Sequence, residues 1–244
     1  MSKYLGVVDA DSILYRCAVT TENEPEGIAK YTLDKFIADN VIAPTGCQEY
    51  IFVFSGGESG RNEIAVTKPY KGKRTTERPK WLGMLKAYAM EQYKGLIIGE
   101  YEADDVVVAI FEQYKGDSLL CGIDKDAKQL SGAHYNYVKK EFFEISDTES
   151  QRFFFKQMLM GDTVDNIPGL PRIGEKKADT LFDENPTIPP ARLVWNLYKE
   201  KGFDWEYYQE QFKLLRMQRD IAYPYEDHFI KFEEKVAEEE FKFD

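Results

Sequence analysis

Residues 4–16 read YLGVVDADSILYR, a short apolar run that ends in an aspartate and passes directly into a helical pattern. The run at 4–8 has the apolar, β-rich composition of a strand buried on both faces, as in a parallel sheet. Further apolar runs and helical patterns alternate up to residue 121. The strands are expected at 4–8, 50–54, 96–98 and 118–121, and the helices at 10–20, 30–40, 79–93 and 103–114. This alternation predicts an α/β fold built on a parallel sheet.

The C-terminal part of the chain has a different character. Residues 135–145 predict one or two further strands, and strand patterns disappear after residue 150. An apolar helix is expected at 151–160, followed by a stretch rich in Gly and Pro and then by further helices. We therefore predict an α/β core over residues 1–150 and a helical subdomain over residues 151–244, which ends in an acidic tail.

The formal net charge of the 244 residues is −11, which argues against a general affinity for nucleic acid. The charge is unevenly distributed along the chain, however. Residues 61–80 hold seven basic and two acidic side chains, whereas residues 220–244 hold nine acidic and three basic ones. A solvated loop explains the basic segment equally well, but a local positive field is also what steers a polyanion toward a site.

Signals for membrane insertion or export are not found in the sequence. No apolar run reaches the length of a membrane span, and the first strand begins too near the N-terminus for a signal peptide. Cys17, Cys47 and Cys121 are odd in number and widely spaced, which favours free thiols in a reducing cytosol over disulfides. We expect a cytoplasmic protein with no membrane partner.

Eight carboxylates occur in four short groups, each at or just after an apolar run. They are Asp9; Glu102, Asp104 and Asp105; Asp124 and Asp126; and Asp162 and Asp165. Because ligands bind at the carboxyl ends of the strands in open parallel sheets, the first three groups are expected at one edge. Taken alone, the group at 102–105 also fits helix N-capping, the pair Asp162 and Asp165 fits turn and cap chemistry, and Asp124 and Asp126 fit a common surface pair in a loop. Together, however, eight negative charges near one edge would repel one another unless a cation held them.

A hard cation bound by oxygen is the best-fitting partner for these acids. The chain has only two histidines and no cysteine pair at metal-ligand spacing, and Mg²⁺ and Mn²⁺ prefer oxygen ligands. Two such ions would assist the attack of water on a phosphodiester and the departure of the leaving oxygen, which removes the need for a histidine base. The sequence therefore predicts a metal-dependent phosphoryl-transfer enzyme.

Five motifs resemble the flap endonuclease / 5′-3′ exonuclease family in its phage and bacterial branch. Residues 7–16 read VVDADSILYR, residues 70–74 read YKGKR and residues 101–105 read YEADD. Residues 124–126 read DKD, and residues 161–178 read GDTVDNIPGLPRIGEKKA, which is similar to the family's helix–three-turn–helix motif. The resemblance runs from about residue 4 to about residue 185, and its last motif is the most specific one.

The resemblance implies a PIN-like parallel-sheet nuclease core, an arch segment at about residues 56–80, and a C-terminal helical subdomain that contains the helix–three-turn–helix. It also implies hydrolysis of DNA or RNA–DNA hybrids near 5′ ends or 5′ flaps, during replication or repair, by a free-standing monomer. Mg²⁺ or Mn²⁺ would bind as two ions, with K⁺ at the helix–three-turn–helix as in relatives.

The resemblance also assigns metal ligands by motif position. The first metal would be held by Asp9, Glu102 and Asp104, with Asp105 nearby, and the second metal by Asp124, Asp126, Asp162 and Asp165.

DNA contacts are assigned in the same way. Lys71 and Arg74 would contact the scissile phosphate, and Tyr70 would stack on a base. The duplex backbone would be gripped by main-chain groups from Gly169 to Gly174 and by Lys176 and Lys177. Backbone amides at a Gly-rich turn bind phosphate without reading base sequence, which agrees with this assignment.

Two positions depart from the family pattern. Ser55 stands where the family usually carries an Asp after the second core strand, which removes one carboxylate, and Asp11 is an additional acid that would compensate in part. Arg172 stands where the turn often has Gly, so the local backbone or its ion site is expected to differ. The departure at Ser55 leaves open a second interpretation, a non-cleaving binder of branched nucleic acid.

A third interpretation concerns the first motif alone. VVDADS at 7–12 is similar to the Asp-x-Asp opening of haloacid-dehalogenase-like phosphatases, in which Asp9 would be the nucleophile and Asp11 the general acid. This interpretation leaves the acids at 102–105 and 124–126 without a role. A phosphatase would act on small esters and ignore duplex DNA, so a branched DNA substrate distinguishes it from a nuclease.

Overall fold

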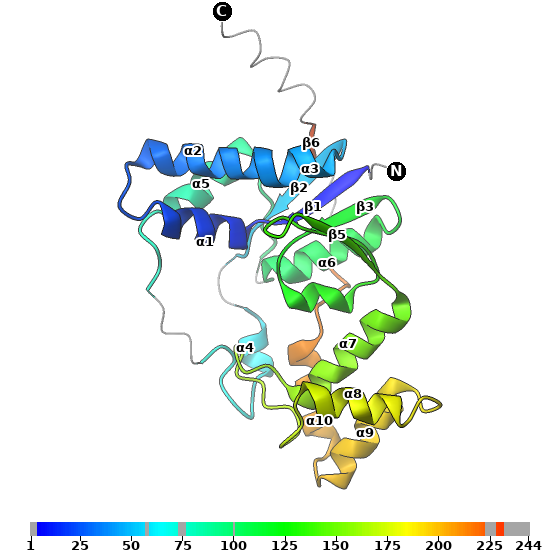
Figure 1. Cartoon of the computed structure of the whole chain (residues 1–244). Helices are drawn as coiled ribbons and strands as arrows, with labels where there is room; N and C mark the ends of the chain where they lie inside the picture. Colours follow the sequence, from blue (N-terminus) through cyan, green and yellow to red (C-terminus); the bar gives the residue numbers. More distant parts are fainter. Residues whose placement is uncertain (1–3, 57–58, 73–76, 100, 223–227, 232–244) are drawn as a thin grey trace, which may run out of the picture.

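The computed structural model of the chain describes residues 4–56, 59–72, 77–99, 101–222 and 228–231 (Figure 1). At its centre is a six-stranded sheet in the order β5-β4-β3-β1-β2-β6. The four inner strands run parallel, and the edge strands β5 and β6 are antiparallel to their neighbours. The strands are β1 (Leu5–Asp9), β2 (Glu49–Val53), β3 (Ser118–Cys121), β4 (Gly132–Asn136), β5 (Glu141–Ile145) and β6 (Ile230–Lys231).

The strands predicted at 4–8, 50–54 and 118–121 are confirmed to within one residue, and all three are buried along nearly their whole length. The strand predicted at 96–98 is wrong, because only Leu96 pairs with the sheet. Its N–H donates to Phe52 at 2.8 Å and its carbonyl accepts from Phe54 at 2.9 Å. The chain then turns at Gly99, whose φ of +43° ends the extended run.

Helices cover both faces of the sheet (Figure 1). On one face, α1 (Asp11–Thr20), α2 (Glu26–Ile37) and α5 (Leu82–Gln92) pack around Phe52 and Phe54. A π-helical turn, η1 (Ala38–Ile42), and α3 (Ala43–Thr45) follow α2. On the other face, α6 (Ala103–Gln113) buries most of its side chains against Val7, Ile51 and Val53. Alternate residues of β1 and β2 thus face opposite cores, as a two-sided strand requires.

A helical region with its own hydrophobic cluster lies beyond the sheet (Figure 1). It consists of α7 (Asp147–Met160), α8 (Glu175–Asp183), α9 (Pro190–Glu200) and α10 (Trp205–Leu215). The first of these helices starts before its predicted position because Ser146 and Glu149 form a reciprocal capping box. A short 3₁₀ segment, η2 (Lys125–Gln129), connects β3 to β4 and contacts α7.

Part of the basic segment belongs to this helical region. The helix α4 (Arg61–Ile64) contacts α10, and Tyr70 is buried in the cluster formed by the C-terminal helices. In Figure 1, α4 lies near the C-terminal helices, well away from α1 and α2. The chain therefore crosses from the sheet to the helical region and back before α5.

The prediction that strands disappear after residue 150 is wrong. After α10 the chain returns to the sheet: Met217 and Ile221 pack in the core beneath α6, and β6 pairs with the edge of β2. A strand of two residues is too short for its pattern to be visible in the sequence. The boundary at residue 150 stays a prediction, and most of the acidic tail, residues 232–244, lies outside the described residues.

Two smaller expectations concern cysteines and membranes. Cys17, Cys47 and Cys121 are all buried and unpaired, as predicted. Within the described part of the chain, no helix has the length and apolar composition needed to cross a membrane.

Candidate metal centre and nucleic-acid interface

The carboxylate groups meet where the sheet adjoins the helical region. Asp9 is the last residue of β1, and Asp124 and Asp126 follow the neighbouring strand β3. Glu102, Asp104 and Asp105 open α6, and Asp162 and Asp165 lie in the turn after α7. Because β1 and β3 are parallel neighbours, their carboxyl ends deliver these acids to the same edge.

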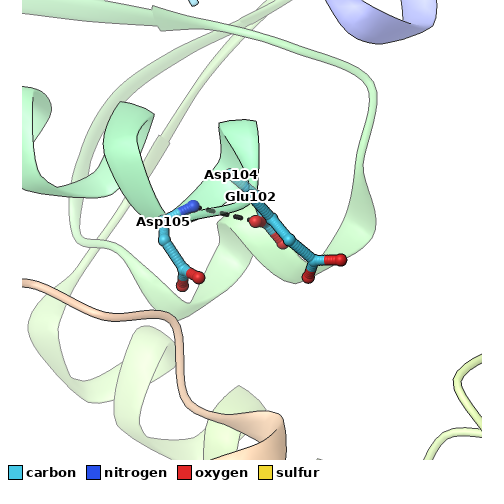
Figure 2. Close-up of side chains that lie close together, drawn as sticks. All are labelled: Glu102, Asp104 and Asp105. Carbon is cyan, nitrogen blue, oxygen red and sulfur yellow. Dashed lines mark hydrogen bonds between the residues drawn. The ribbon is translucent and has the colours of Figure 1, made fainter. Parts of the chain in front are cut away.

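Three of the acids form a compact group at the start of α6. Each of Glu102, Asp104 and Asp105 offers a carboxylate oxygen within 4.8 Å of the other two, and the side chains leave neighbouring positions of one turn (Figure 2). Asp104 also accepts a hydrogen bond of 2.8 Å from the Asp105 N–H. The group lies at the positive end of the α6 dipole, which favours negative charge.

Asp104 joins two adjoining hollows. The first hollow is lined by Asp9, Asp104 and Asp124 together with apolar residues of α6 and β3. The second is lined by Asp104, Asp126, Asp162 and Asp165, with Arg61 and Tyr70. Acids from four separate stretches of sequence therefore surround Asp104, and every predicted ligand lies in a hollow or in the group that contains Asp104.

Several of these carboxylates are hard to ionise without a counter-charge. Burial, together with the charges of Asp11 and Asp124, raises the pKa of Asp9 from its ordinary 3.8 to about 7. Burial and the neighbouring Asp124 raise the pKa of Asp126 to about 6. Burial and Asp105 raise the pKa of Asp104 well above its ordinary value. The donor set consists of oxygens that need positive charge, which is the chemistry a hard divalent cation supplies.

Three basic side chains already neutralise part of this charge. The Lys71 ammonium binds Glu102, and together with Arg61 it holds the pKa of Glu102 below its ordinary value despite burial. The Lys125 ammonium lies 2.8 Å from Asp162 and, against the effect of burial, lowers the pKa of that carboxyl. Both lysines are flexible and partly exposed, so they can leave their carboxylates when a stronger cation arrives.

Arg61 is the third of these cations and is held differently. It is only 5% exposed and forms a two-bonded pair with Asp105, at 2.6 and 2.8 Å, as well as a bond of 2.7 Å to Glu102. Asp105 also accepts from the Gln218 N–H at 2.7 Å. Both oxygens of Asp105 are therefore engaged, which makes it a partner of Arg61 rather than an open metal ligand.

The sequence analysis counted Arg61 among the basic residues of segment 61–80, for which a solvated loop and a DNA-steering patch both stayed open, and the structure buries it against Asp105 and Glu102. The sequence does not show whether a basic residue in a charged segment faces solvent or a buried acid, because its burial depends on how the segment packs against distant parts of the chain. The available signal was the apolar pair Ile64-Ala65, which packs against the cluster of the C-terminal helices.

Tyr70 and Lys71 lie at the junction between the two regions. Tyr70 is 7% exposed, and its hydroxyl lies 2.9 Å from Glu102 and 3.1 Å from Asp165, so its one hydrogen is shared between the two carboxylates. Because the ring of Tyr70 is buried, neither of its faces is open to the base on which it was predicted to stack. Lys71 adopts a left-handed backbone, with φ of +52°, and its ammonium reaches the acid group at Glu102. Arg74 lies outside the described residues.

The turn after α7 is built around two glycines in close contact. A Cβ on Gly169 would lie 2.3 Å from the Gly161 nitrogen, and both residues have positive φ. Gly169 is buried, and its carbonyl accepts from the Tyr207 hydroxyl at 3.2 Å, so it does not present main-chain groups to a duplex. The contact of Gly169 with the DNA backbone therefore stays a prediction, which its buried and hydrogen-bonded main chain does not favour.

The remaining part of the turn is open to solvent. Gly174 caps α8 and is exposed, as are Lys176 and Lys177 in the first turn of that helix. Arg172 adopts φ of +63°, a conformation that glycine takes at little cost, so the left-handed backbone persists without glycine. A helix N-terminus with two exposed lysines suits a phosphate backbone.

Ser55 bridges the sheet and α6 instead of contributing a carboxylate. Its hydroxyl accepts from the Ala103 N–H at 2.9 Å, and its own N–H donates to Asp11 at 3.0 Å. The Lys86 ammonium donates to the Ser55 carbonyl. Asp11, the additional acid noted in the sequence, thus reaches the end of β2, where the family usually carries its carboxylate.

Two glutamines that the sequence analysis did not identify support the second hollow. Gln157 of α7 is 3% exposed and donates to Asp126 at 2.5 Å, and Gln129 donates to Gln157 at 2.8 Å. Gln129 also donates to the Leu215 carbonyl at 2.8 Å, which connects η2 to the end of α10. A polar residue in a predicted apolar helix was the available signal for Gln157, because buried amides need partners.

Comparison with known proteins confirms the resemblance seen in the motifs. A 5′-3′ exonuclease of Buchnera aphidicola is 29% identical over 76% of this chain and 72% of its own length. The DNA polymerase I of Bacillus caldotenax is 27% identical over 91% of this chain. That match covers only 27% of the polymerase, so the chain spans about a quarter of the length of such relatives. No protein-family model matches the chain.

Solved structures share the fold. A flap endonuclease of bacteriophage T5, in a complex with DNA and metal ions, superposes with a TM-score of 0.63 at 20% identity, covering 86% of this chain and 88% of its own. Flap endonuclease-1 of Methanococcus jannaschii superposes with a TM-score of 0.56 at 15% identity, covering 89% and 79%. The fold is thus the PIN-like α/β fold of these nucleases, as predicted from the sequence.

Proposed function

We propose that this chain is a divalent-metal-dependent 5′ nuclease of the flap endonuclease / 5′-3′ exonuclease type, which hydrolyses phosphodiesters of DNA near 5′ ends. The observation that carries the proposal is the convergence of acids from four separate stretches around Asp104, in two adjoining hollows. The names of the sequence relatives support the same activity.

We assign the metal ligands by hollow, which places Asp124 with the first metal instead of the second metal expected from the motifs. Asp9, Asp104 and Asp124 face the first hollow, and Asp126, Asp162 and Asp165 face the second, with Asp104 shared. Glu102 completes the group at α6, and Asp105 supports it through Arg61. Mg²⁺ or Mn²⁺, when bound, supplies positive charge that activates water and stabilises the leaving oxygen. The all-oxygen donor set and the raised pKa values of Asp9, Asp104 and Asp126 fit such ions.

The chain's own residues then position the substrate. Lys71, released from Glu102, contacts the scissile phosphate, and we assign Arg74 the same role from its place in the motif. Lys176 and Lys177 hold the duplex backbone at the start of α8. These contacts meet phosphates and not base edges, so the enzyme recognises DNA structure rather than sequence.

Further parts of the proposal rest on the resemblance alone. We infer cleavage of 5′-flap DNA, with RNA–DNA hybrids as a further substrate, by a monomer in the cytoplasm, or in the host cytoplasm for a phage-encoded chain. A K⁺ ion at the turn between α7 and α8 also stays a prediction.

The test is the length of products from a labelled 5′-flap DNA incubated with Mg²⁺, Mn²⁺, Ca²⁺ or chelator. We expect short 5′ products with Mg²⁺ or Mn²⁺, none with chelator, and binding without cleavage in Ca²⁺. Intact DNA in every metal would contradict the proposal.

A second candidate function is a binder of branched DNA that does not cleave, and Ser55 is the observation that favours it. Its hydroxyl is used by Ala103, so it cannot replace a carboxylate at the first hollow. Tight binding in Ca²⁺ with no product in Mg²⁺ or Mn²⁺ would select this function. The phosphatase interpretation loses support because Asp9 shares its hollow with Asp104 and Asp124, which that chemistry leaves unused.

A further inference from the structure

A buried glutamate of the helical region holds the chain segment that leads to Lys71. Glu210, on α10, is 5% exposed. One of its carboxylate oxygens accepts from the Val66 N–H at 2.8 Å and from the Thr67 N–H at 2.7 Å, and the other accepts from the Thr67 hydroxyl. The carboxylate therefore binds two successive amides and a side chain of the same loop.

This arrangement resembles the way a carboxylate caps a helix end, but it joins two distant parts of the chain. A buried carboxylate is costly unless hydrogen bonds replace its lost hydration. Hydrogen bonds to an ionised oxygen are stronger than neutral ones, so three of them make a stiff connection. The desolvation cost of burying Glu210 is thus offset by hydrogen bonds only while Val66 and Thr67 stay in place.

Two more bonds continue the attachment toward Lys71. The Asn166 side-chain amide donates to the Pro69 carbonyl at 2.9 Å, and the Lys71 N–H donates to the Asp165 carbonyl at 3.0 Å. Asn166 and Asp165 belong to the turn after α7, so this contact also comes from the helical region. The backbone of residues 66–71 is therefore bonded at three successive points to the part of the molecule that carries α8 and α10.

The position of Lys71 depends on this attachment. Its left-handed backbone, with φ of +52°, is a conformation that a lysine rarely adopts unless its surroundings impose it. If residues 66–69 moved, the Lys71 backbone would relax, and its ammonium would no longer be held beside the metal centre where the scissile phosphate binds.

We propose that Glu210 is a positioning residue for Lys71, through which the helical region that binds duplex sets the geometry of phosphate cleavage. The inference rests on the proposed function, since it takes Lys71 as a contact to the scissile phosphate. It implies that loosening α10 from the loop slows cleavage although no acid of the metal centre has changed.

The test is a double-mutant cycle in single-turnover cleavage of a 5′-flap DNA. We expect Glu210→Ala to lower the rate about tenfold or more while DNA affinity changes by about twofold or less, because misplacing a reacting group costs rate more than binding. In the Lys71→Ala background, Glu210→Ala should have an effect of about twofold or less, since its action passes through Lys71. Glu206→Ala, an exposed glutamate one turn earlier on α10, is the matched control and should cleave at the wild-type rate.

A second measurement does not depend on cleavage. Hydrogen exchange of the Val66 and Thr67 amides should accelerate at least about tenfold in Glu210→Ala and remain unchanged in Glu206→Ala, while exchange in β1 and β3 stays slow. Unchanged exchange in Glu210→Ala overturns the inference. So does an equal loss of rate with and without Lys71, because that would mark Glu210 as merely structural. If the wild type fails to cleave, the proposed function fails, and accelerated exchange would then still establish the attachment without a catalytic role.

Discussion

Single residues at this centre face a conflict between burial and charge. Asp104 is surrounded by other acids, and only Arg61, Lys71 and Lys125 offset them in the described part of the chain. Arg61 is buried and doubly bonded, so it acts as a permanent counter-ion. Lys71 and Lys125 are partly exposed and can exchange partners. The counter-charge that Arg61 supplies is therefore fixed, whereas the one that Lys71 or Lys125 supplies can be replaced by a metal ion.

A carboxylate in each hollow tests the proposed metal ligands. Asp124→Asn and Asp162→Asn keep the shape of the side chain and an oxygen that can accept the existing backbone bonds from Asp126 and Val164. We expect each to lower the cleavage rate by about a hundredfold or more, because a neutral amide binds Mg²⁺ poorly, with DNA affinity nearly unchanged. Asp117→Asn, an exposed change at the opposite end of β3, is the control. Normal turnover in both variants would refute the assignment.

Asp9 makes the stability of the metal-free protein depend on pH. Burial raises the pKa of Asp9 in the folded protein to about 7, whereas its ordinary value of 3.8 applies to the unfolded chain. Between these values the folded state binds more protons, so the stability from this residue is present at low pH and is lost as pH rises toward 7. Between pH 4.5 and pH 7.5, the free energy of unfolding of the wild type should fall on the order of 1–2 kcal/mol more than that of Asp9→Asn. This figure allows for the partial exposure of Asp9.

Urea unfolding in chelator at these two pH values measures the effect. The wild type should lose more stability than Asp9→Asn as pH rises. A similar but smaller difference is expected for Asp126→Asn, because the pKa of Asp126 lies near 6. Identical pH slopes for the wild type and Asp9→Asn would show that Asp9 titrates normally in the fold.

At the scale of elements, the turn after α7 has no room for a side chain at its two glycines. Gly169 has φ of +61°, and a Cβ there would lie 2.3 Å from the Gly161 nitrogen, which is backbone and cannot swing away. We expect Gly169→Ala to destabilise the protein by about 2–4 kcal/mol. Gly83→Ala, in an open position of α5, should stabilise it by about 0.5–1 kcal/mol. Thermal unfolding of the two variants should therefore shift in opposite directions, and an unshifted Gly169→Ala would contradict the close contact.

The elements also show what the sequence could and could not predict. The strands β1, β2 and β3 were predictable because a run buried on both faces is apolar throughout. The single paired residue Leu96 could not be told from a short strand, because the apolar run at 96–98 has the same composition in both cases. The grouping of Asp9, Asp104 and Asp124 followed from strand ends, but the burial of Arg61 and Tyr70 required the loop to fold onto α10. Such long-range contacts leave no periodic pattern along the chain.

At the scale of the whole molecule, the two regions share the centre between them. The sheet and α6 supply Asp9, Asp104 and Asp124, and the helical region supplies Asp162, Asp165 and the support of Gln157 and Glu210. The net charge of −11 is thus partly concentrated at one junction. Repulsion there opposes the association of the two regions, and a cation bound at the junction relieves it.

Metal binding should consequently stabilise the whole fold. A ligand that binds only the folded protein adds about 2.7 kcal/mol at a free concentration one hundred times its Kd. We expect Mg²⁺ or Mn²⁺ to raise the melting temperature above that in chelator, and more than NaCl of equal ionic strength does, because screening alone is non-specific.

Asp104→Asn separates the two effects of this acid. The variant removes a carboxyl whose ionised form is disfavoured by burial and by Asp105, so it should be at least as stable as the wild type in chelator. Its neutral amide also carries no negative charge at the side chain that both hollows share, so it should gain much less stability from Mg²⁺. The wild type would then be the less stable protein without metal and the more strongly stabilised one with it. An equal gain in the two proteins would mean that the metal binds away from Asp104, and the proposed centre would have to be abandoned.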